Sequence, residues 1–261
     1  MSKIKPLLAH SFDKNKVDPQ GWWLSEKLDG VRCVAIGGKF FTRTGKPINA
    51  PASFLKDIPT GHVFDGELYG SRDNFDKVSG IARQKFPVEK NWAALSYRIF
   101  DIVDLKKPFE KRQELLNTLI PTDHKHLVVV DQTLCKGQAH LDSMLESIEE
   151  GGGEGLMLRE AKSLYVCKRS HTLLKVKSFK DVDARVVEHT LGKGRNKRVL
   201  GAVVCELPNK KRFRCGSGFS DAQRKKPPPV GSLITVKYFE MTKRGVPRFP
   251  TYVGQRLEQD L

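Results

Sequence analysis

A lysine beside an acidic turn is the first feature of the chain that could carry chemistry. Lys27 stands in the segment 25–32, where Asp29 and Gly30 form a dipeptide typical of tight turns. A lysine amine can act as a covalent nucleophile when nearby positive charge or partial burial lowers its pKa. The alternative is a solvated lysine next to an ordinary turn that Asp29 caps. This segment alone favours the ordinary turn, so the decision depends on what accompanies it.

Further segments follow in order and hold residue types suited to nucleotide chemistry. Glu67 and Glu154 are carboxylates of the kind that hard divalent cations prefer, and Phe100 offers a flat aromatic face. Each feature has a structural alternative: strand glutamates in weak surface ion pairs, a core phenylalanine, or a strand with two lysines facing solvent. The segments are Thr42-Arg43-Thr44-Gly45, Phe64-Asp65-Gly66-Glu67-Leu68, Tyr97-Arg98-Ile99-Phe100-Asp101, Glu154-Gly155-Leu156-Met157-Leu158-Arg159 and Leu174-Lys175-Val176-Lys177.

The elements that must position these residues are mostly short strands. Apolar runs that alternate with turn residues predict strands within 31–38, 39–45, 62–70 and 97–105, and again at 156–160 and 173–177. Apolar spacing predicts two helices, Phe109–Leu119 and Ala139–Glu149. The glycine-rich segment 151–155 precedes a strand rather than a helix, so it is predicted to be a turn and not a phosphate cradle.

The composition changes near residue 181, where a second domain is expected to begin. Four apolar runs separated by basic or Gly/Pro turns lie within 184–191, 198–207, 211–219 and 232–241, without a helical pattern. Such spacing predicts a small closed barrel, of which the OB-fold is a common nucleic-acid-binding type. The predicted domains are therefore 1–180 and 181–261.

Charge and composition limit the function classes. The net charge is +16, and residues 182–261 hold 17 Lys and Arg against 7 Asp and Glu, a net +10. That excess favours a polyanionic partner, the alternative being a basic protein kept soluble by its charge. The five scattered cysteines form no metal or disulfide pattern, and no P-loop motif is present. Without a long apolar run or a signal-peptide core, the chain is expected to be intracellular and free of the membrane.

Taken together, the ordered segments resemble the covalent nucleotidyltransferase superfamily of DNA ligases, RNA ligases and mRNA capping enzymes. The segments LSEKLDGVR, HVFDGELYG, EEGGGEGLMLR, RVLGAVV, GSGFSDAQR and TKRGVPRF further resemble the minimal bacterial ATP-dependent DNA ligases often called ligase E. The resemblance covers nearly the whole chain. It implies an α+β fold, with an antiparallel-rich adenylation domain followed by a small all-β OB-fold barrel. Those relatives are commonly exported.

The resemblance also implies a role for each site residue. Lys27, next to Asp29, would attack ATP, with Lys175 and Lys177 bracketing the phosphate. Glu67 and Glu154 would lie near the ribose and a magnesium ion. The remaining roles are Phe100 stacking on adenine, Ser25 and Glu26 at the adenine edge, Arg32 on the ribose, Arg43 on the nick 5′-phosphate, Arg256 on pyrophosphate, and Lys193, Arg195, Lys197 and Arg198 on DNA phosphates.

Some assignments rest on weaker matches. Arg169 stands in a segment like the ligase Gly-Arg-Ser pattern, but Lys168 occupies the glycine position. Arg43 could instead be an exposed hairpin residue, and Arg256 an ordinary surface charge. If Arg256 does not serve pyrophosphate, Arg248 or Lys243 is the next candidate.

The expected function is an ATP-dependent DNA ligase that seals nicks in duplex DNA through lysyl-AMP and adenylated DNA. ATP is expected rather than NAD because only 26 residues precede Lys27. Mg²⁺, or Mn²⁺ in its place, is the expected metal. The expected partner is nicked duplex DNA, bound by a monomer without an obligate protein partner. The alternatives are an RNA ligase, a capping guanylyltransferase, or a non-catalytic OB-fold protein that binds nucleic acid.

Overall fold

The structure is a computed structural model that describes residues 5–242 and 244–256. The chain divides into two compact units, Met1–Lys177 and Ser178–Leu261, and each is described by itself.

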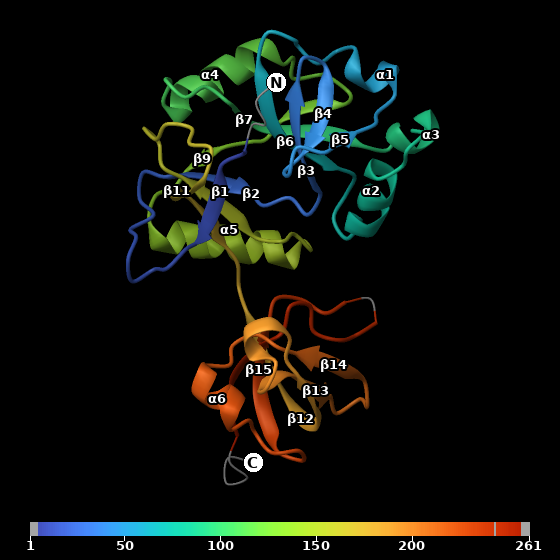
Figure 1. Ribbon diagram of the computed structural model, residues 1–261. Helices are drawn as coiled ribbons and strands as arrows, with labels where there is room; N and C mark the ends of the chain where they lie inside the picture. The colour runs from blue at the N-terminus through green and yellow to red at the C-terminus, as the bar shows by residue number, and fades with distance from the viewer. Residues whose placement is uncertain (1–4, 243, 257–261) are drawn as a thin grey trace. The chain divides into compact units, whose positions relative to one another are not determined.

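The first unit contains a six-stranded sheet, here called sheet B, built from one continuous stretch of chain (Figure 1). Neighbouring strands are antiparallel except for the last pair, β7 and β8. In spatial order the strands are β5 (Pro47–Ile48), β4 (Lys39–Thr42), β3 (Val31–Ile36), β6 (Val63–Tyr69), β7 (Ser96–Ile102) and β8 (Leu127–Val129). Helices α1 (Ala52–Leu55), α2 (Phe75–Ala82), α3 (Glu89–Trp92) and α4 (Phe109–Leu119) supply side chains to its core.

The five-stranded sheet A of this unit joins strands from the start and the end of the unit, coloured blue and yellow in Figure 1. Its order is β1 (Leu8–Ser11), β11 (Arg169–Val176), β10 (Leu156–Arg159), β2 (Trp23–Glu26) and β9 (Thr133–Leu134). Helix α5 (Gln138–Glu150) packs its Leu141 against Leu174 and Val176 of β11. Because side chains alternate along a strand, Lys175 is left on the other face of the sheet.

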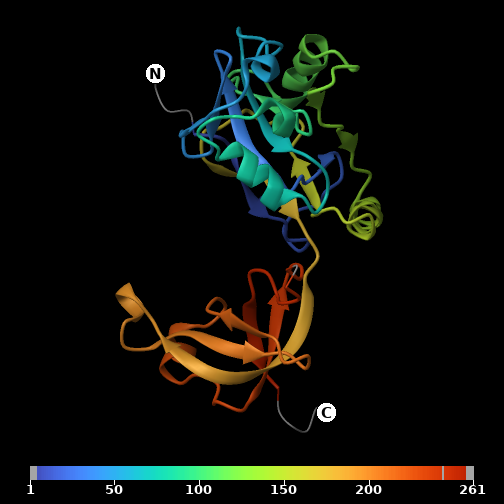
Figure 2. The same cartoon turned by 90° about the vertical axis from the view of Figure 1, so that its right-hand side faces the viewer.

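The second unit is a five-stranded antiparallel sheet. Its strands follow the spatial order β14 (Arg212–Cys215), β13 (Leu200–Glu206), β12 (Lys180–Leu191), β15 (Leu233–Tyr238) and β16 (Thr251–Gln255). The long β12 bends through the sheet, as Figure 2 shows, and its register against β13 shifts twice. The 3-10 turn η1 (Gly194–Asn196) and helix α6 (Asp221–Lys225) interrupt the strands.

The barrel expected from the sequence is not closed by a full ladder among the described residues. Only an isolated parallel bridge, Ser217 to Thr251, links the two edges of the sheet. Gly218 has φ +91°, and a side chain there would collide with the backbone of Tyr252. This close approach brings the edges together at one point without extending the pairing. Helix α6 was not expected either, although its Ser220–Gln223 capping box is visible in the sequence.

The predicted helix Phe109–Leu119 is confirmed as α4, and the predicted Ala139–Glu149 is confirmed as α5 with one more residue at each end. The segment 151–155 is a turn, as predicted, in which Gly151 ends α5 and Gly152 has φ +78°. Among the described residues, no helix is both long and apolar enough to cross a membrane.

Candidate active site

A cavity of about 240 Å³ lies between sheets A and B of the first unit. Sheet A contributes the face opposite α5, which presents Ser25, Met157 and Lys175 side by side in the strand register. Sheet B contributes Glu67 from β6 and Phe100 from β7. With Lys27 and Arg43, the cavity therefore collects residues from all six of the sequence segments identified above.

Lys27 follows the last residue of β2 and lines this cavity. Its backbone N–H donates to the Gly155 carbonyl oxygen at 2.8 Å, which fixes the lysine beside the start of β10. Its Nζ donates to Oε2 of Glu154, and Nζ of Lys177 donates to Oε1 of the same carboxylate. Glu154 thus bridges two lysines, and its side chain is only 13% exposed.

Lys175 and Lys177 do not face open solvent, unlike the two lysines of an ordinary surface strand. Lys175 lines the cavity, and Lys177 is held by Glu154. Burial lowers the pKa of Lys177, the ion pair with Glu154 raises it, and the nearby Lys27 and Lys175 ammonium groups lower it further. The site is therefore one where positive charges are brought close together.

Close packing against β6 requires a glycine at position 30 of the Lys27 segment. A Cβ at this position would collide with the Leu68 carbonyl oxygen and lie 2.8 Å from Cγ of Glu67. Only glycine lets the loop after β2 approach β6 this closely. Asp29 is partly buried and lies near Tyr69, where it contributes to the raised pKa of that phenol, but it is not among the described residues that line the cavity.

Glu67 is a carboxylate in an unfavourable environment for charge. Desolvation at the cavity wall raises its pKa to about 7, while the Arg32 guanidinium and the Lys27 ammonium oppose that rise. Such a carboxylate gains from any additional positive charge placed beside it.

Arg32, which was expected on the ribose, makes several hydrogen bonds within the protein. Its Nε and Nη2 donate to the two carboxylate oxygens of the buried Asp65 at 2.7 and 2.6 Å, and Nη2 also donates to the Leu7 carbonyl at 3.1 Å. Its guanidinium lies 4.6 Å from the centre of the Phe100 ring. Most of its donors are thus already engaged within the protein, so Arg32 cannot offer its Asp65-facing fork to a nucleotide.

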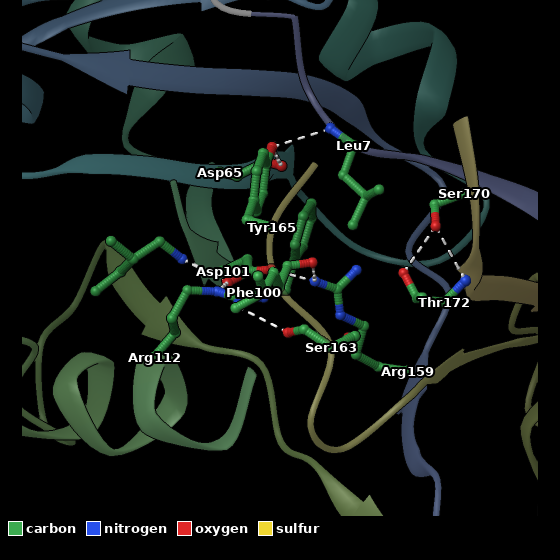
Figure 3. A network of polar contacts seen from close by, with 12 residues as sticks. Leu7, Asp65, Phe100, Asp101, Arg112, Arg159, Ser163, Tyr165, Ser170 and Thr172 are labelled. Carbon is green, nitrogen blue, oxygen red and sulfur yellow. Dashed lines mark hydrogen bonds and ion pairs between the residues drawn. The ribbon is translucent and has the colours of Figure 1, made fainter. Parts of the chain in front are cut away.

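Phe100 is a cavity residue rather than a core residue. It is partly exposed, whereas its neighbours Ile99 and Asp101 are buried. Arg32 packs over the ring. Tyr165 also lines the cavity. Its hydroxyl donates to Asp65 at 2.6 Å and accepts from the Leu7 N–H at 3.0 Å, which holds the ring in place (Figure 3).

A second buried network, formed by residues to which the sequence assigned no role, lies at the same wall (Figure 3). Asp101 accepts from Nε and Nη2 of Arg112 at 2.6 and 2.9 Å, and from Nη2 of Arg159 at 3.4 Å. Burial raises the pKa of Asp101, against the effect of both arginines. Arg159 is 3% exposed, and its Nε and Nη1 have no hydrogen-bond partner among the described residues. Burial lowers its pKa to about 10. Two buried donor atoms of this cavity-lining arginine therefore lack an acceptor among the described residues.

The alternation of β10 could have identified Arg159. Leu156 and Leu158 pack towards α5, so Met157 and Arg159 share the cavity face. In the register of β10 with β2, Met157 lies opposite the cavity residue Ser25, and Arg159 lies opposite Trp23.

The remaining expected residues lie at the rim of the cavity or in the second unit. Arg43 is exposed and lines the cavity, and so does Arg169, whose Nη1 donates to the Ala9 carbonyl. Ser25, which is 7% exposed, and Glu26 also line it.

In the second unit, Arg256 pairs with Asp183 at 3.2 Å and Arg248 pairs with Glu240. Lys243 lies outside the described residues. The four basic residues expected to contact DNA phosphates are exposed in the turn between β12 and β13, where Arg195 also pairs with Asp221 at 3.0 Å. They are Lys193, Arg195, Lys197 and Arg198.

The first unit places a lysine amine beside a carboxylate in a cavity between two antiparallel-rich sheets, and an OB-like unit follows it along the chain. This combination defines the covalent nucleotidyltransferase fold. Residues 6–177 match the ATP dependent DNA ligase domain, and residues 191–256 match the DNA ligase OB-like domain. The chain belongs to the family of ATP-dependent DNA ligases.

Individual relatives agree with this membership. Over 247 residues the chain is 36% identical to a DNA ligase of Haemophilus influenzae, covering 94% of this chain and 90% of that protein. A solved structure from a study of Lig E DNA ligases has a TM-score of 0.90 at 36% identity, covering 96% and 98% of the two chains. The Chlorella virus DNA ligase-adenylate has a TM-score of 0.57 at 27% identity, covering 98% and 99%. The resemblance to the minimal DNA ligases is thus confirmed.

Proposed function

We propose that this chain seals nicks between a 5′-phosphate and a 3′-hydroxyl in duplex DNA, using ATP. The observation that carries the proposal is the placement of the Lys27 amine, beside Glu154, in the cavity between the two sheets. Lys27 would take AMP from ATP, pass it to the 5′-phosphate of the nick, and release it when the 3′-hydroxyl joins the strands.

In the first step, the lone pair of Lys27 Nζ forms a bond to the α-phosphorus, and the bond from that phosphorus to the pyrophosphate oxygen breaks. Nζ must lose its proton before it can attack. Glu154 Oε2 accepts a hydrogen bond from Nζ, so this carboxylate is placed to receive the proton. Lys175 and Lys177 supply positive charge for the phosphate oxygens, and such electrostatic stabilisation dominates phosphoryl transfer.

The opposite end of the cavity would hold the nucleoside. Phe100 offers a partly exposed ring on which adenine can stack, and the packed Arg32 keeps that ring in place. Ser25 and the backbone of Glu26 line the cavity on sheet A and would contact the edge of the base. Arg159 would donate the unpaired Nε and Nη1 hydrogens to acceptor atoms of the nucleotide.

A magnesium ion suits the carboxylates of this site. Glu67 and Glu154 interact electrostatically with each other, and the raised pKa of Glu67 means that its ionised form would gain from a cation. No group of three ligating side chains occurs among the described residues, but magnesium needs only one or two carboxylates beside waters and phosphates. When bound, the ion would offset the negative charge of the triphosphate.

The two parts of the chain would divide the work. Residues 1–180 would form the adenylation domain, in which Arg43 at the cavity rim binds the 5′-phosphate of the nick. Residues 181–261 would form the OB domain, whose exposed basic turn at 193–198 contacts DNA phosphates without reading bases. Arg256 would serve pyrophosphate. We expect a monomer.

One assay tests the proposal against an RNA ligase and a capping enzyme. The full chain is incubated with labelled ATP or labelled GTP, and its intact mass is measured before nicked DNA or nicked RNA is added. We expect one AMP adduct from ATP, absent in Lys27→Ala, followed by sealing of nicked DNA. An adduct that persists in Lys27→Ala, labelling by GTP, or sealing of RNA alone would refute the proposal.

A further inference from the structure

The guanidinium of Arg72 holds together three segments of the first unit. Its Nε and Nη2 donate to the two carboxylate oxygens of Glu26 at 3.0 and 3.1 Å, which makes a bidentate ion pair. Its Nη1 donates to the Gly151 carbonyl oxygen at 2.7 Å. One side chain therefore joins the last residue of β2, the residue that ends α5, and the loop that follows β6.

Each of the three joined segments carries a residue of the proposed chemistry. Glu26 directly precedes Lys27, and Gly151 lies three residues before Glu154. The loop that contains Arg72 continues from β6, which carries Glu67. Sheet A and sheet B are thus connected by a charged pair beside the nucleophile, in addition to the cavity walls themselves.

The glycine-rich segment is shaped around this contact. A Cβ on Gly151 would collide with Nη1 of Arg72, and a Cβ on Gly153 would lie 3.1 Å from Oε1 of Glu26 and 2.5 Å from Cγ2 of Ile148. Larger residues at these two positions would push the guanidinium or its carboxylate partner away. A side chain at Gly151 would thus displace the guanidinium, whereas Gly153 is required mainly because the backbone and side chain of Ile148 lie within 3 Å.

We propose that Arg72 is a positioning residue for lysyl-AMP formation. By fixing Glu26 and Gly151, it holds Lys27 Nζ and the Glu154 carboxylate in the geometry required for attack on the α-phosphate. Arg72 is not among the described residues that line the cavity, so it acts through these segments and not by touching the nucleotide. The inference rests on the proposed function.

Positioning and nucleotide binding predict different kinetics. A misplacement of about 1 Å can cost about 100-fold in rate, whereas residues that contact ATP mainly set its half-saturating concentration. We therefore expect Arg72→Ala to lower the maximal rate of lysyl-AMP formation by about 10- to 100-fold, with half-saturating ATP changed less than about twofold. Arg72→Lys should recover part of the rate, because an ammonium keeps the ion pair but not the fork.

The experiment measures single-turnover lysyl-AMP formation against ATP concentration for the full chain without DNA. Glu26→Gln is a second variant that weakens the same ion pair. If Arg72→Ala fails to fold, the rates of Glu26→Gln and Arg72→Lys test the proposal instead. Arg83→Ala, an exposed arginine of the same unit, is the matched control and should adenylate at the wild-type rate. Sealing of a nick that already carries AMP should fall much less than adenylation, because that step involves no attack by Lys27.

Three results would overturn the inference. The first is a maximal rate within about twofold of wild type in all folded variants of the pair. The second is a raised half-saturating ATP concentration at an unchanged maximal rate. The third is an equal loss in adenylation and in sealing of the pre-adenylated nick, which indicates a general structural defect. Failure of the wild type to form lysyl-AMP would instead refute the proposed function, and this inference with it.

Discussion

Replacing Glu67 by glutamine should change how the stability of the first unit depends on pH. The pKa of Glu67 rises from 4.5 to about 7 on folding, mainly because the cavity wall desolvates the carboxylate. Between these two values the folded chain binds a proton that the unfolded chain has released. The stability contribution of protonated Glu67 is therefore present below about pH 4.5 and is lost as the pH rises through 7.

The magnitude of the lost stability follows from the same two pKa values. Each tenfold change in proton affinity is worth about 1.4 kcal/mol. The full loss of folding free energy is therefore about 3 kcal/mol at most, because the side chain keeps some contact with solvent in the cavity. Glutamine does not ionise, so Glu67→Gln should show no such loss. Relative to wild type, the variant should be more stable at pH 8 than at pH 5 by up to about 2.5 kcal/mol, because unfolded Glu67 is already mostly ionised at pH 5.

Urea unfolding at pH 5 and pH 8 measures this difference. All three tryptophans lie at positions 22, 23 and 92, so tryptophan fluorescence reports on the first unit without a contribution from the second. Added Mg²⁺ should stabilise the wild type more at pH 8, where Glu67 is ionised, than at pH 5. Equal pH dependence in wild type and Glu67→Gln would refute the argument.

Other residues yield sharp predictions as well. Arg159→Met should raise the half-saturating ATP concentration for lysyl-AMP formation about 10-fold or more, because acceptor atoms of the nucleotide lose two donor atoms; an unchanged value would remove Arg159 from the nucleotide site. Arg256→Ala should slow lysyl-AMP formation but still seal a pre-adenylated nick, whereas Arg43→Ala should do the reverse; adenylation of Arg256→Ala at the wild-type rate would contradict the pyrophosphate role. Neutralising four exposed basic residues should weaken nick binding for every sequence and flatten the slope of log affinity against log salt by up to about 3 to 4; an unchanged slope would mark them as a solvated surface. Those four are Lys193, Arg195, Lys197 and Arg198.

The candidate site was predictable where chemistry follows the period of a strand. Leu174 and Val176 alternate with Lys175, so the alternation alone separates a core face from a polar face. The family resemblance added the order of the segments. The fold class was confirmed for the same reason, since short alternating runs predict antiparallel-rich sheets.

What the sequence could not supply was the partner of each charged group. The sequence did not show that Asp65 of the neighbouring strand engages two nitrogens of Arg32, because strand register decides that pairing. Glu154 was expected to face a metal. Its hydrogen bond from Lys27 was not predictable, because it depends on how the turn before β10 places Glu154 beside Lys27. The prediction that the barrel is closed was wrong for a related reason. The number of strands indicated a barrel, but closure depends on backbone pairing between the sheet edges, which meet only at the bridge next to Gly218 among the described residues.

The parallel pairing of β1 with β11 sets an order of assembly during synthesis. Leu8 pairs with Arg169, and the Leu7 N–H donates to the hydroxyl of Tyr165, so the start of the chain must wait about 160 residues for its partners. Sheet B lies entirely within residues 31–129 and needs neither end of the unit. Contacts between distant parts of a chain form late, because closing a long loop costs entropy. A nascent chain can therefore build sheet B early, but it has no walled nucleotide cavity until Lys175 has been added.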